Sequence, residues 1–207
     1  MKLFTVDIPY GNAGSAESPH GFSNTNSYIE IGWDDTWLPN PYYCNSWFQF
    51  DVSLMPNIPI RYVQSAILRI NKAGDASNGS SYALTSAIHQ ILRPLFSPNN
   101  PTWSKYDGVN NWAIAGGTGN GTDRVATPLF VLNNSTPVVN GFYEFPLSLE
   151  FLNTILTGNL NFGIYTTSPK PPSGSPYGPD RRTISKNNFY IHITYRKPSL
   201  SGDVTIF

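Results

Sequence analysis

The chain contains a single cysteine, Cys44, so it cannot form a disulfide bond within itself. Small secreted proteins that cannot build a sufficient core depend on several disulfide bonds. The sequence therefore excludes a disulfide-stabilised scaffold. With 207 residues, of which 40% are hydrophobic and 14% aromatic, the chain is long enough to be stabilised by burying its own apolar side chains.

Charged side chains are also scarce, at 13% of the residues against roughly 25% in an average soluble protein. The 13 Lys and Arg residues balance 13 Asp and Glu residues, so the formal net charge is zero. Contacts to nucleic-acid phosphates require a basic excess, so a general nucleic-acid-binding protein is excluded. Low charge together with many Asn, Ser, Thr, Gly and Pro residues favours a rigid β-protein with a binding or structural role.

Long hydrophobic runs are absent. No segment approaches the roughly 18–20 apolar residues of a membrane-spanning helix, and we expect no membrane partner. After Lys2, the first apolar run is interrupted at Thr5 and Asp7, too early for the hydrophobic part of a secretory signal peptide. We therefore expect synthesis in a reducing cytoplasm, with any later relocation through assembly or lysis.

Short segments in which apolar and polar residues alternate recur between turn-forming residues. They are typical of half-buried antiparallel strands, which we predict within 2–8, 27–33, 47–52, 63–70, 82–92 and 189–195. The predicted inward-facing residues include Phe48, Phe50, Val52, Ala66, Leu68, Ile70, Phe189, Ile191 and Ile193. The pattern predicts an all-β fold, an antiparallel jelly-roll-like β-sandwich with one short connecting helix.

Two local motifs refine this prediction. Asn140-Gly141 lies between β-forming residues, which predicts a two-residue hairpin turn of type I′. Ser148 precedes an amphipathic segment at 149–157, and Gly158 follows it. Serine at the N-cap and glycine after the last turn are typical helix boundaries, so this segment is the predicted helix.

Three segments show no regular pattern: 9–26, 98–123 and 168–187. We predict an N-terminal strand and docking segment at 1–25, one β-sandwich domain at 26–197 and a C-terminal tail at 198–207. The tail ends in the β-forming residues 204–207, which we expect to add a strand to the sheet edge of a neighbouring subunit. The cations Arg181, Arg182 and Lys186 are predicted at a solvated loop tip.

The order of several short segments resembles that of the DNRLRE-type β-sandwich domains, over roughly residues 26–196. The matching segments are 47–56 (WFQFDVSLMP), 63–70 (VQSAILRI), 101–104 (PTWS), 112–117 (WAIAGG), 142–147 (FYEFPL) and 161–165 (NFGIY). Such domains occur in extracellular and cell-wall proteins and in phage virion proteins. The run 103–112, followed by 116–119, is especially similar to the phage proteins.

The resemblance implies no catalytic residue. It implies a non-enzymatic phage virion surface protein, either a capsid decoration protein or a small fibre or receptor-binding component. The expected partners are other virion proteins, the expected location is the virion surface, and the expected assembly is a homotrimer.

Catalytic side chains are not grouped in the sequence. The histidines, His20, His89 and His192, lie far apart, and the glutamates are Glu17, Glu30, Glu144 and Glu150. A glycosidase needs two carboxylates in one cleft, and no such pairing is evident in the sequence. For a glycoside-cleaving enzyme, the least favoured of the functions considered, Glu144 is the candidate residue. The run 116–122 lacks the Lys-Ser/Thr of a phosphate-binding loop. We therefore expect no enzyme.

One irregular segment is rich in oxygen ligands. Asp107 and Asp123 are its charged residues, accompanied by Asn110, Asn111 and Asn120. Calcium prefers such ligands, so a calcium site is one interpretation. The same residue types are also the common turn formers, which is the other, and no further cofactor is indicated.

Aromatic residues form two groups. Trp33, Asp34, Trp37, Tyr42 and Tyr43 combine aromatic rings with a carboxylate, as in sites that stack and orient sugars. A carbohydrate-binding module recognising cell-surface or cell-wall glycans is thus the alternative function. The other interpretation is that these rings anchor loops on the sandwich, and it is favoured for both groups. It is favoured most for Trp103 in the second group, Trp103, Tyr106 and Trp112, so the first group is the better candidate for a ligand site.

Overall fold

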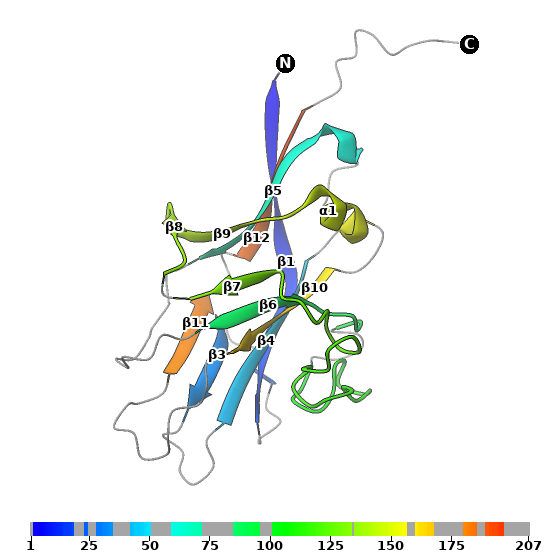
Figure 1. Cartoon of the computed structure of the whole chain (residues 1–207), viewed down its shortest axis with the longest axis vertical. Coiled ribbons are helices and arrows are strands. Elements are labelled where there is room, and N and C mark those ends of the chain that lie inside the picture. The colour runs from blue at the N-terminus through cyan, green and yellow to red at the C-terminus, as the bar shows by residue number, and fades with distance from the viewer. Residues whose placement is uncertain are drawn as a thin grey trace, which may run out of the picture.

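The computed structural model describes residues 2–18, 23–24, 28–34, 42–50, 59–71, 85–95, 101–133, 135–156, 160–167, 180–185 and 189–196. These contain twelve strands, one α-helix and one short 3-10 helix (Figure 1). The strands are β1 (Leu3–Ser18), β2 (Ser23–Asn24), β3 (Tyr28–Asp34), β4 (Tyr42–Phe50), β5 (Val63–Asn71), β6 (Ser86–Gln90), β7 (Phe130–Leu132), β8 (Val138–Val139), β9 (Phe142–Pro146), β10 (Leu160–Thr166), β11 (Asp180–Ser185) and β12 (Phe189–Arg196). The helices are α1 (Leu149–Leu156) and η2 (Ile60–Tyr62).

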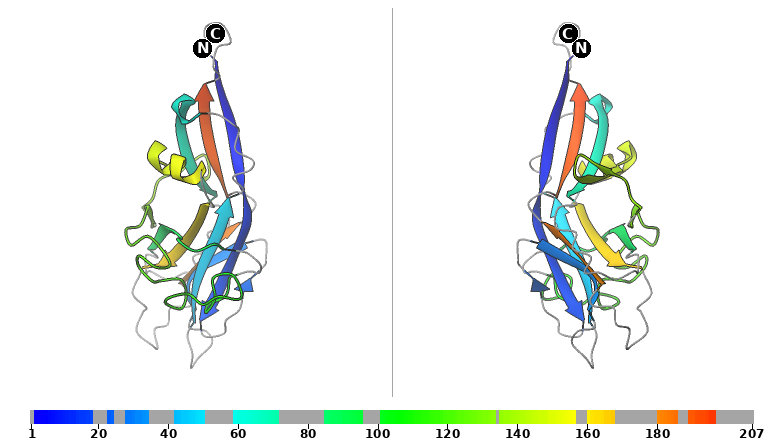
Figure 2. Two further views of the ribbon diagram at one scale, coloured as in Figure 1. Left: turned by 90° about the vertical axis from the view of Figure 1, so that its right-hand side faces the viewer. Right: turned by 90° about the vertical axis from the view of Figure 1, so that its left-hand side faces the viewer.

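All strands belong to one sheet, whose main path runs β7-β6-β10-β4-β1-β12-β5-β9-β8. The long strand β1 joins its two halves (Figure 2). Residues 3–9 of β1 pair with β12, and residues 10–18 pair with β4 after a register shift between Tyr10 and Asn12. Every one of the pairings along this path is antiparallel. The all-β antiparallel fold with one short helix is confirmed, while its jelly-roll-like sandwich form stays a prediction.

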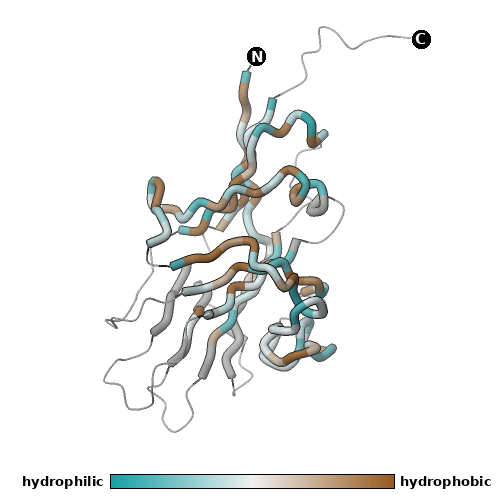
Figure 3. The backbone as a smooth tube through the Cα atoms, viewed as in Figure 1, coloured by the Kyte–Doolittle hydropathy of each residue, from teal (hydrophilic) through white to brown (hydrophobic). Residues whose placement is uncertain are grey.

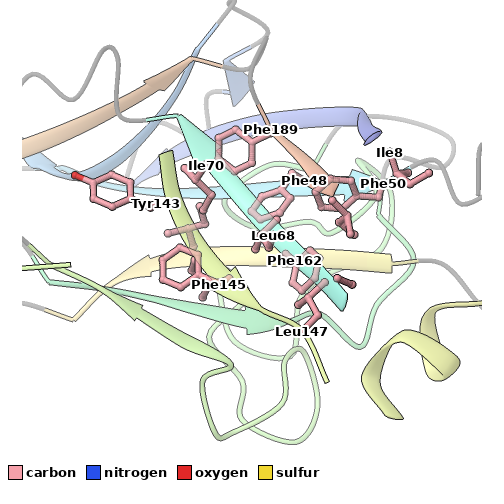
Figure 4. Close-up of a cluster of buried hydrophobic side chains, with 14 of the residues drawn as sticks. Ile8, Phe48, Phe50, Leu68, Ile70, Tyr143, Phe145, Leu147, Phe162 and Phe189 are labelled. Atoms are coloured by element: carbon pink, nitrogen blue, oxygen red, sulfur yellow. The ribbon is translucent and has the colours of Figure 1, made fainter. Parts of the chain in front are cut away.

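The main core lies between the two halves of the curled sheet (Figure 4). Phe48 of β4 packs against Phe162 of β10 in its own half, with ring centroids 5.2 Å apart. It also packs against Phe189 of β12 in the other half, at 5.0 Å. The predicted inward-facing residues on β4, β5 and β12 are buried. Val52 lies outside the described residues.

Both local motifs behave as predicted. Asn140 and Gly141 have φ angles of +50° and +86°, the left-handed values that a type I′ turn requires, and the turn joins β8 to β9. The hydroxyl of Ser148 accepts a hydrogen bond of 3.0 Å from the backbone N–H of Phe151, so it caps α1. Leu152 of this helix is buried in the main core, and Gly158 lies outside the described residues.

Two of the segments predicted as irregular contain strands. Residues 9–18 continue β1, and 180–185 form β11, where Asp180 lies opposite Trp33 and Arg181 opposite Gly32 of β3. The prediction was wrong here because backbone pairing with β4 and β3 overrides weak local β-propensity. The N-terminal segment predicted to dock on other subunits thus contributes a strand to the middle of the sheet. Lys186 and residues 198–207 lie outside the described residues.

No helix in the described part of the chain is long and apolar enough to cross a membrane.

Candidate functional site

Residues 101–125 form an irregular loop, here called the Trp loop, on the half of the sheet built from β4, β6 and β10 (Figure 1). It carries short hydrophobic stretches between hydrophilic ones (Figure 3). A second core cluster lies beneath it, separate from the main core. This cluster contains Trp47, Ile91, Leu95, Trp112 and Tyr165, with Trp103 and Tyr106 packed against it. The loop therefore covers the face of the sheet that points away from the main core.

Trp47 is the centre of this contact. Strand alternation turns it away from its neighbour Phe48, which enters the main core. It is nevertheless fully buried, because the ring of Trp112 stacks on it with centroids 5.3 Å apart. The indole N–H of Trp112 in turn donates a 3.0 Å hydrogen bond to the backbone carbonyl of Thr102.

Tyr165 of β10 connects the sheet to the loop. Its phenolic oxygen accepts a hydrogen bond of 3.2 Å from Trp47 Nε1 and donates one of 2.9 Å to the carbonyl of Gly117. Its ring folds back over Gly163 on the same strand, where a Cβ atom would lie 2.5 Å from the ring. Burial raises the pKa of Tyr165, so the phenol stays neutral and keeps its proton for Gly117.

The carboxylate of Asp123 holds the Trp loop in shape from within. One of its oxygens accepts the backbone N–H of Ala113 at 2.9 Å and the guanidinium Nε of Arg93 at 3.2 Å. The other accepts the N–H groups of Ile114 at 2.9 Å and Gly119 at 3.2 Å. A carboxylate offers about four acceptor positions, and all of them are used here on a side chain with no exposed surface.

Asp107 organises a tighter turn. Its carboxylate accepts the backbone N–H groups of Val109 at 2.8 Å and Asn110 at 2.6 Å, and the side-chain amide of Asn110 at 2.7 Å. Burial raises its pKa, but these hydrogen bonds outweigh burial and leave the pKa below its ordinary value. Among the described residues no three His, Cys, Asp or Glu side chains are grouped as metal ligands. Of the two interpretations that the sequence leaves open, the hydrogen bonds of Asp107 and Asp123 favour turn and loop formation.

His89 and Arg124 flank Tyr165. The Nδ1 atom of His89 lies 2.8 Å from the carbonyl oxygen of Val125, and its ring meets that of Tyr165 edge to face at 5.6 Å. Burial lowers the pKa of His89, with a smaller contribution in the same direction from Arg124. Neutral His89 therefore donates its Nδ1–H to the carbonyl of Val125, which fixes the tautomer.

A cavity of about 270 Å³ lies where the Trp loop meets the sheet. Side chains from β4, β10, the Trp loop and the segment after β10 line it: Asn45, Trp103, Ala115, Thr118, Arg124, Tyr165 and Thr167. Asn45 Nδ2 donates a 3.0 Å hydrogen bond to the carbonyl of Gly116. Gly116 has a φ of +79°, and a Cβ atom there would lie 2.8 Å from the ring of Trp103. Glycine thus allows Trp103 to form one wall of the cavity.

The structure brings together four of the five residues predicted to bind glycans, at the level of the backbone. In the pairing of β3 with β4, Trp33 lies opposite Tyr43 and Asp34 lies opposite Tyr42. Trp37 lies outside the described residues. Tyr43 is two positions before Asn45, so this strand pair leads to the rim of the cavity.

Two of the histidine and glutamate residues noted in the sequence, Glu144 and His192, are engaged in pairs on the sheet. Glu144 lies opposite Arg69, and their charged groups approach to 2.7 Å. His192 lies opposite Asp7, at 2.6 Å between Nδ1 and the carboxylate.

Sequence reasoning missed most residues that line the cavity. Asn45, Tyr165 and Thr167 come from strands or strand ends far from the Trp loop in sequence, and Asn45 is 71 residues from its partner Gly116. The available signal was Trp47, a large aromatic residue on the strand face opposite the main core. Its position predicts that something covers that face, though not which segment.

No protein-family model matches the chain, and no curated protein matches it in sequence. The resemblance to DNRLRE-type domains therefore stays a prediction.

Proposed function

We propose that the chain is a non-enzymatic phage virion surface protein, a capsid decoration protein or a small fibre or receptor-binding component. The observation that carries the proposal is the internal support of the Trp loop. This loop includes the runs 103–112 and 116–119, for which the sequence predicts a resemblance to phage proteins. Its backbone is fixed by the buried carboxylate of Asp123 and by the phenol of Tyr165, so the loop is a pre-formed contact surface.

The outer side of this loop favours permanent contacts. Val109 and Ile114 are 53% and 56% exposed, on a chain whose net charge is zero. Apolar side chains on a rigid surface suit a packed subunit interface, whereas reversible encounters are commonly steered by charge. The expected partners are other virion proteins and two further copies of this chain.

The test combines two measurements. Light scattering after size exclusion should give the mass of a homotrimer, and gold-labelled antibodies against the protein should decorate intact phage particles. A monomer that also fails to label any particle would overturn the proposal. Double substitution of Val109 and Ile114 by Ser should reduce incorporation into particles, with Val131→Ser as an exposed apolar control outside the loop.

A second function, carbohydrate binding, is favoured by the cavity beside Trp103 and by the paired aromatic positions of β3 and β4. A virion protein that attaches to host glycans needs such a site, so the two functions are compatible. The test is binding of the intact protein to an array of cell-surface and cell-wall glycans. If the sugar binds at the predicted site 33–43, Trp37→Ala should abolish binding without unfolding the protein. Retained binding would contradict that site and leave the cavity beside Trp103 as the candidate.

A further inference from the structure

Arg124 places a positive charge at the wall of the cavity, which lies where the Trp loop meets the sheet. Arg124 is half-buried, its Nε donates a 3.1 Å hydrogen bond to the side-chain oxygen of Asn120, and its guanidinium carbon lies 4.4 Å from the ring centroid of Tyr165. By contrast, Arg69 and Arg93 each form an ion pair with a carboxylate. Among the described residues no carboxylate pairs with Arg124, so its charge is available to a ligand.

The guanidinium group is also held in a defined position. The contact with Asn120 uses only Nε, and the stacking on Tyr165 restricts the group further. Arginine has further N–H donors at its terminal nitrogens, arranged as a fork that matches a carboxylate. An anion bound there would gain charge-assisted hydrogen bonds with little loss of side-chain freedom, because the arginine is already ordered.

The remaining lining residues fit a hydroxylated ring. Trp103 provides a partly exposed aromatic surface, which packs well against the apolar face of a sugar. The hydroxyl of Thr118 donates to the carbonyl of Ala115, and that of Thr167 donates to the carbonyl of Thr85. Each hydroxyl oxygen therefore keeps acceptor lone pairs that hydroxyl groups of a ligand can use.

From this arrangement we propose that the cavity binds one sugar residue carrying a carboxylate group, with the carboxylate on Arg124 and the ring against Trp103. The volume of about 270 Å³ lies just below the roughly 300–1,000 Å³ of sites for drug-sized ligands, so a single sugar unit is the fitting size. The inference rests on the proposed carbohydrate binding, whose ligand class it specifies, and not on the virion assignment.

The test is titration calorimetry of the full-length protein with glucuronic acid and with N-acetylneuraminic acid. Glucose and N-acetylglucosamine are the uncharged probes. At least one acidic sugar should bind more tightly than the neutral sugars, and binding should weaken as salt is added, because the carboxylate pairs with a cation.

Two substitutions examine the residues involved. Arg124→Gln should weaken binding of the acidic sugar by about 10- to 100-fold, the loss expected for a hydrogen bond to a charged group. Arg61→Gln is the matched control, because Arg61 also stacks on a tyrosine, Tyr62, with 5.0 Å from its guanidinium carbon to the ring, but does not line the cavity. Trp103→Leu should weaken acidic and neutral sugars alike. Circular dichroism of each variant establishes that it is folded.

The possible results distinguish binding of an acidic sugar at Arg124 from carbohydrate binding in general. Selective binding of an acidic sugar that depends on Arg124 supports the inference. Equal binding of acidic and neutral sugars, unchanged in Arg124→Gln, would overturn it while leaving carbohydrate binding intact. Absence of binding for all four probes would overturn it as well, and absence on the glycan array in addition would remove the carbohydrate function itself. Should Arg124→Gln fail to fold, Arg124→Lys replaces it, and undiminished binding in that variant would contradict a fork-shaped contact.

Discussion

The phenolic oxygen of Tyr165 lies 3.2 Å from the indole nitrogen of Trp47, and both side chains are buried. The two residues stand on neighbouring strands, β10 and β4, and the same phenol donates to the carbonyl of Gly117 in the Trp loop. One hydroxyl group therefore satisfies a donor of the sheet and an acceptor of the loop. In a buried position, loss of this hydroxyl leaves both partners without this hydrogen bond.

Tyr165→Phe is expected to lower the free energy of unfolding by about 1–3 kcal/mol, the usual cost of leaving buried polar groups unpaired. Urea denaturation followed by tryptophan fluorescence measures it. Tyr62→Phe is the control, because the hydroxyl of Tyr62 has an exposed hydrogen bond of 3.4 Å with Arg61, and its loss should cost less than about 0.5 kcal/mol. Equal effects of the two substitutions would contradict the role given to Tyr165.

Asp123→Asn keeps the shape of the side chain but replaces one acceptor oxygen by a donor. Four N–H groups converge on this carboxylate. The free energy of unfolding of the variant should therefore be lower by about 3 kcal/mol, as for a broken buried ion pair. Amide hydrogen exchange should show faster exchange at Ala113, Ile114 and Gly119. Asp7→Asn is the comparison, since the Asp7 side chain is 56% exposed; unchanged exchange at the three amides in Asp123→Asn would refute the assignment.

Substituting two glycines of the Trp loop distinguishes the effect of backbone strain on stability from the effect of close packing. Gly116 and Gly121 have φ angles of +79° and +74°, but only at Gly116 would an added methyl group meet other atoms within 4 Å, the nearest being 2.8 Å away on Trp103. Gly121→Ala should lower the free energy of unfolding by about 1 kcal/mol, the strain of an alanine in the left-handed conformation. Gly116→Ala should cost about 1–3 kcal/mol more, because the methyl group displaces Trp103. Thermal unfolding of both variants provides the comparison, and equal costs would argue against a close contact with Trp103.

His89 should make the stability depend on pH. Burial holds its folded pKa below the ordinary value, which is about 6.5 in an unfolded chain. Below about pH 6.5 the unfolded chain therefore takes up a proton more readily than the folded protein, and stability falls as the pH falls. Above that pH both states are neutral at this position, and the contribution is constant.

The measurement is the free energy of unfolding in urea between about pH 5 and about pH 8. His89→Gln should flatten the decrease on the acid side, whereas His192→Gln, on a more exposed part of the sheet, serves as the control for loss of a histidine. If His89→Gln retained the full acid-side decrease, another group would have to be its source.

Much of the main core could be predicted from the sequence, because strand alternation places residues such as Leu68 and Ile191 on one face regardless of what they contact. The same holds for Asn140-Gly141 and for the cap at Ser148, where the signal is local. The second core could not be predicted in this way. Trp47 and Tyr165 are buried by a loop with no period of its own, so their partners are set by long-range contacts alone.

In the candidate site, too, some features could be predicted from local sequence and others depend on long-range contacts. The grouping of positions 33, 34, 42 and 43 was visible in the sequence, and the pairing of β3 with β4 brings them together. The cavity was not visible, because Asn45, Arg124 and Thr167 come from three separate segments. Asp123 was ambiguous for a different reason: an acidic residue beside glycines has the same pattern whether it binds an ion or the backbone around it.

The pairing of β1 with β12 decides where additions to the chain would emerge. Leu3 lies opposite Arg196, so the start of β1 and the end of β12 lie together at one pole of the molecule. The Trp loop lies toward the other pole (Figure 2). A reporter domain attached directly at Leu3 or at Arg196 would therefore lie at the pole away from the loop and its cavity. A mechanical load applied at Leu3 and Arg196 would break the hydrogen bonds between β1 and β12 one after another, starting at that pole. The half of the sheet built from β4, β6 and β10, which carries the Trp loop, would unfold last.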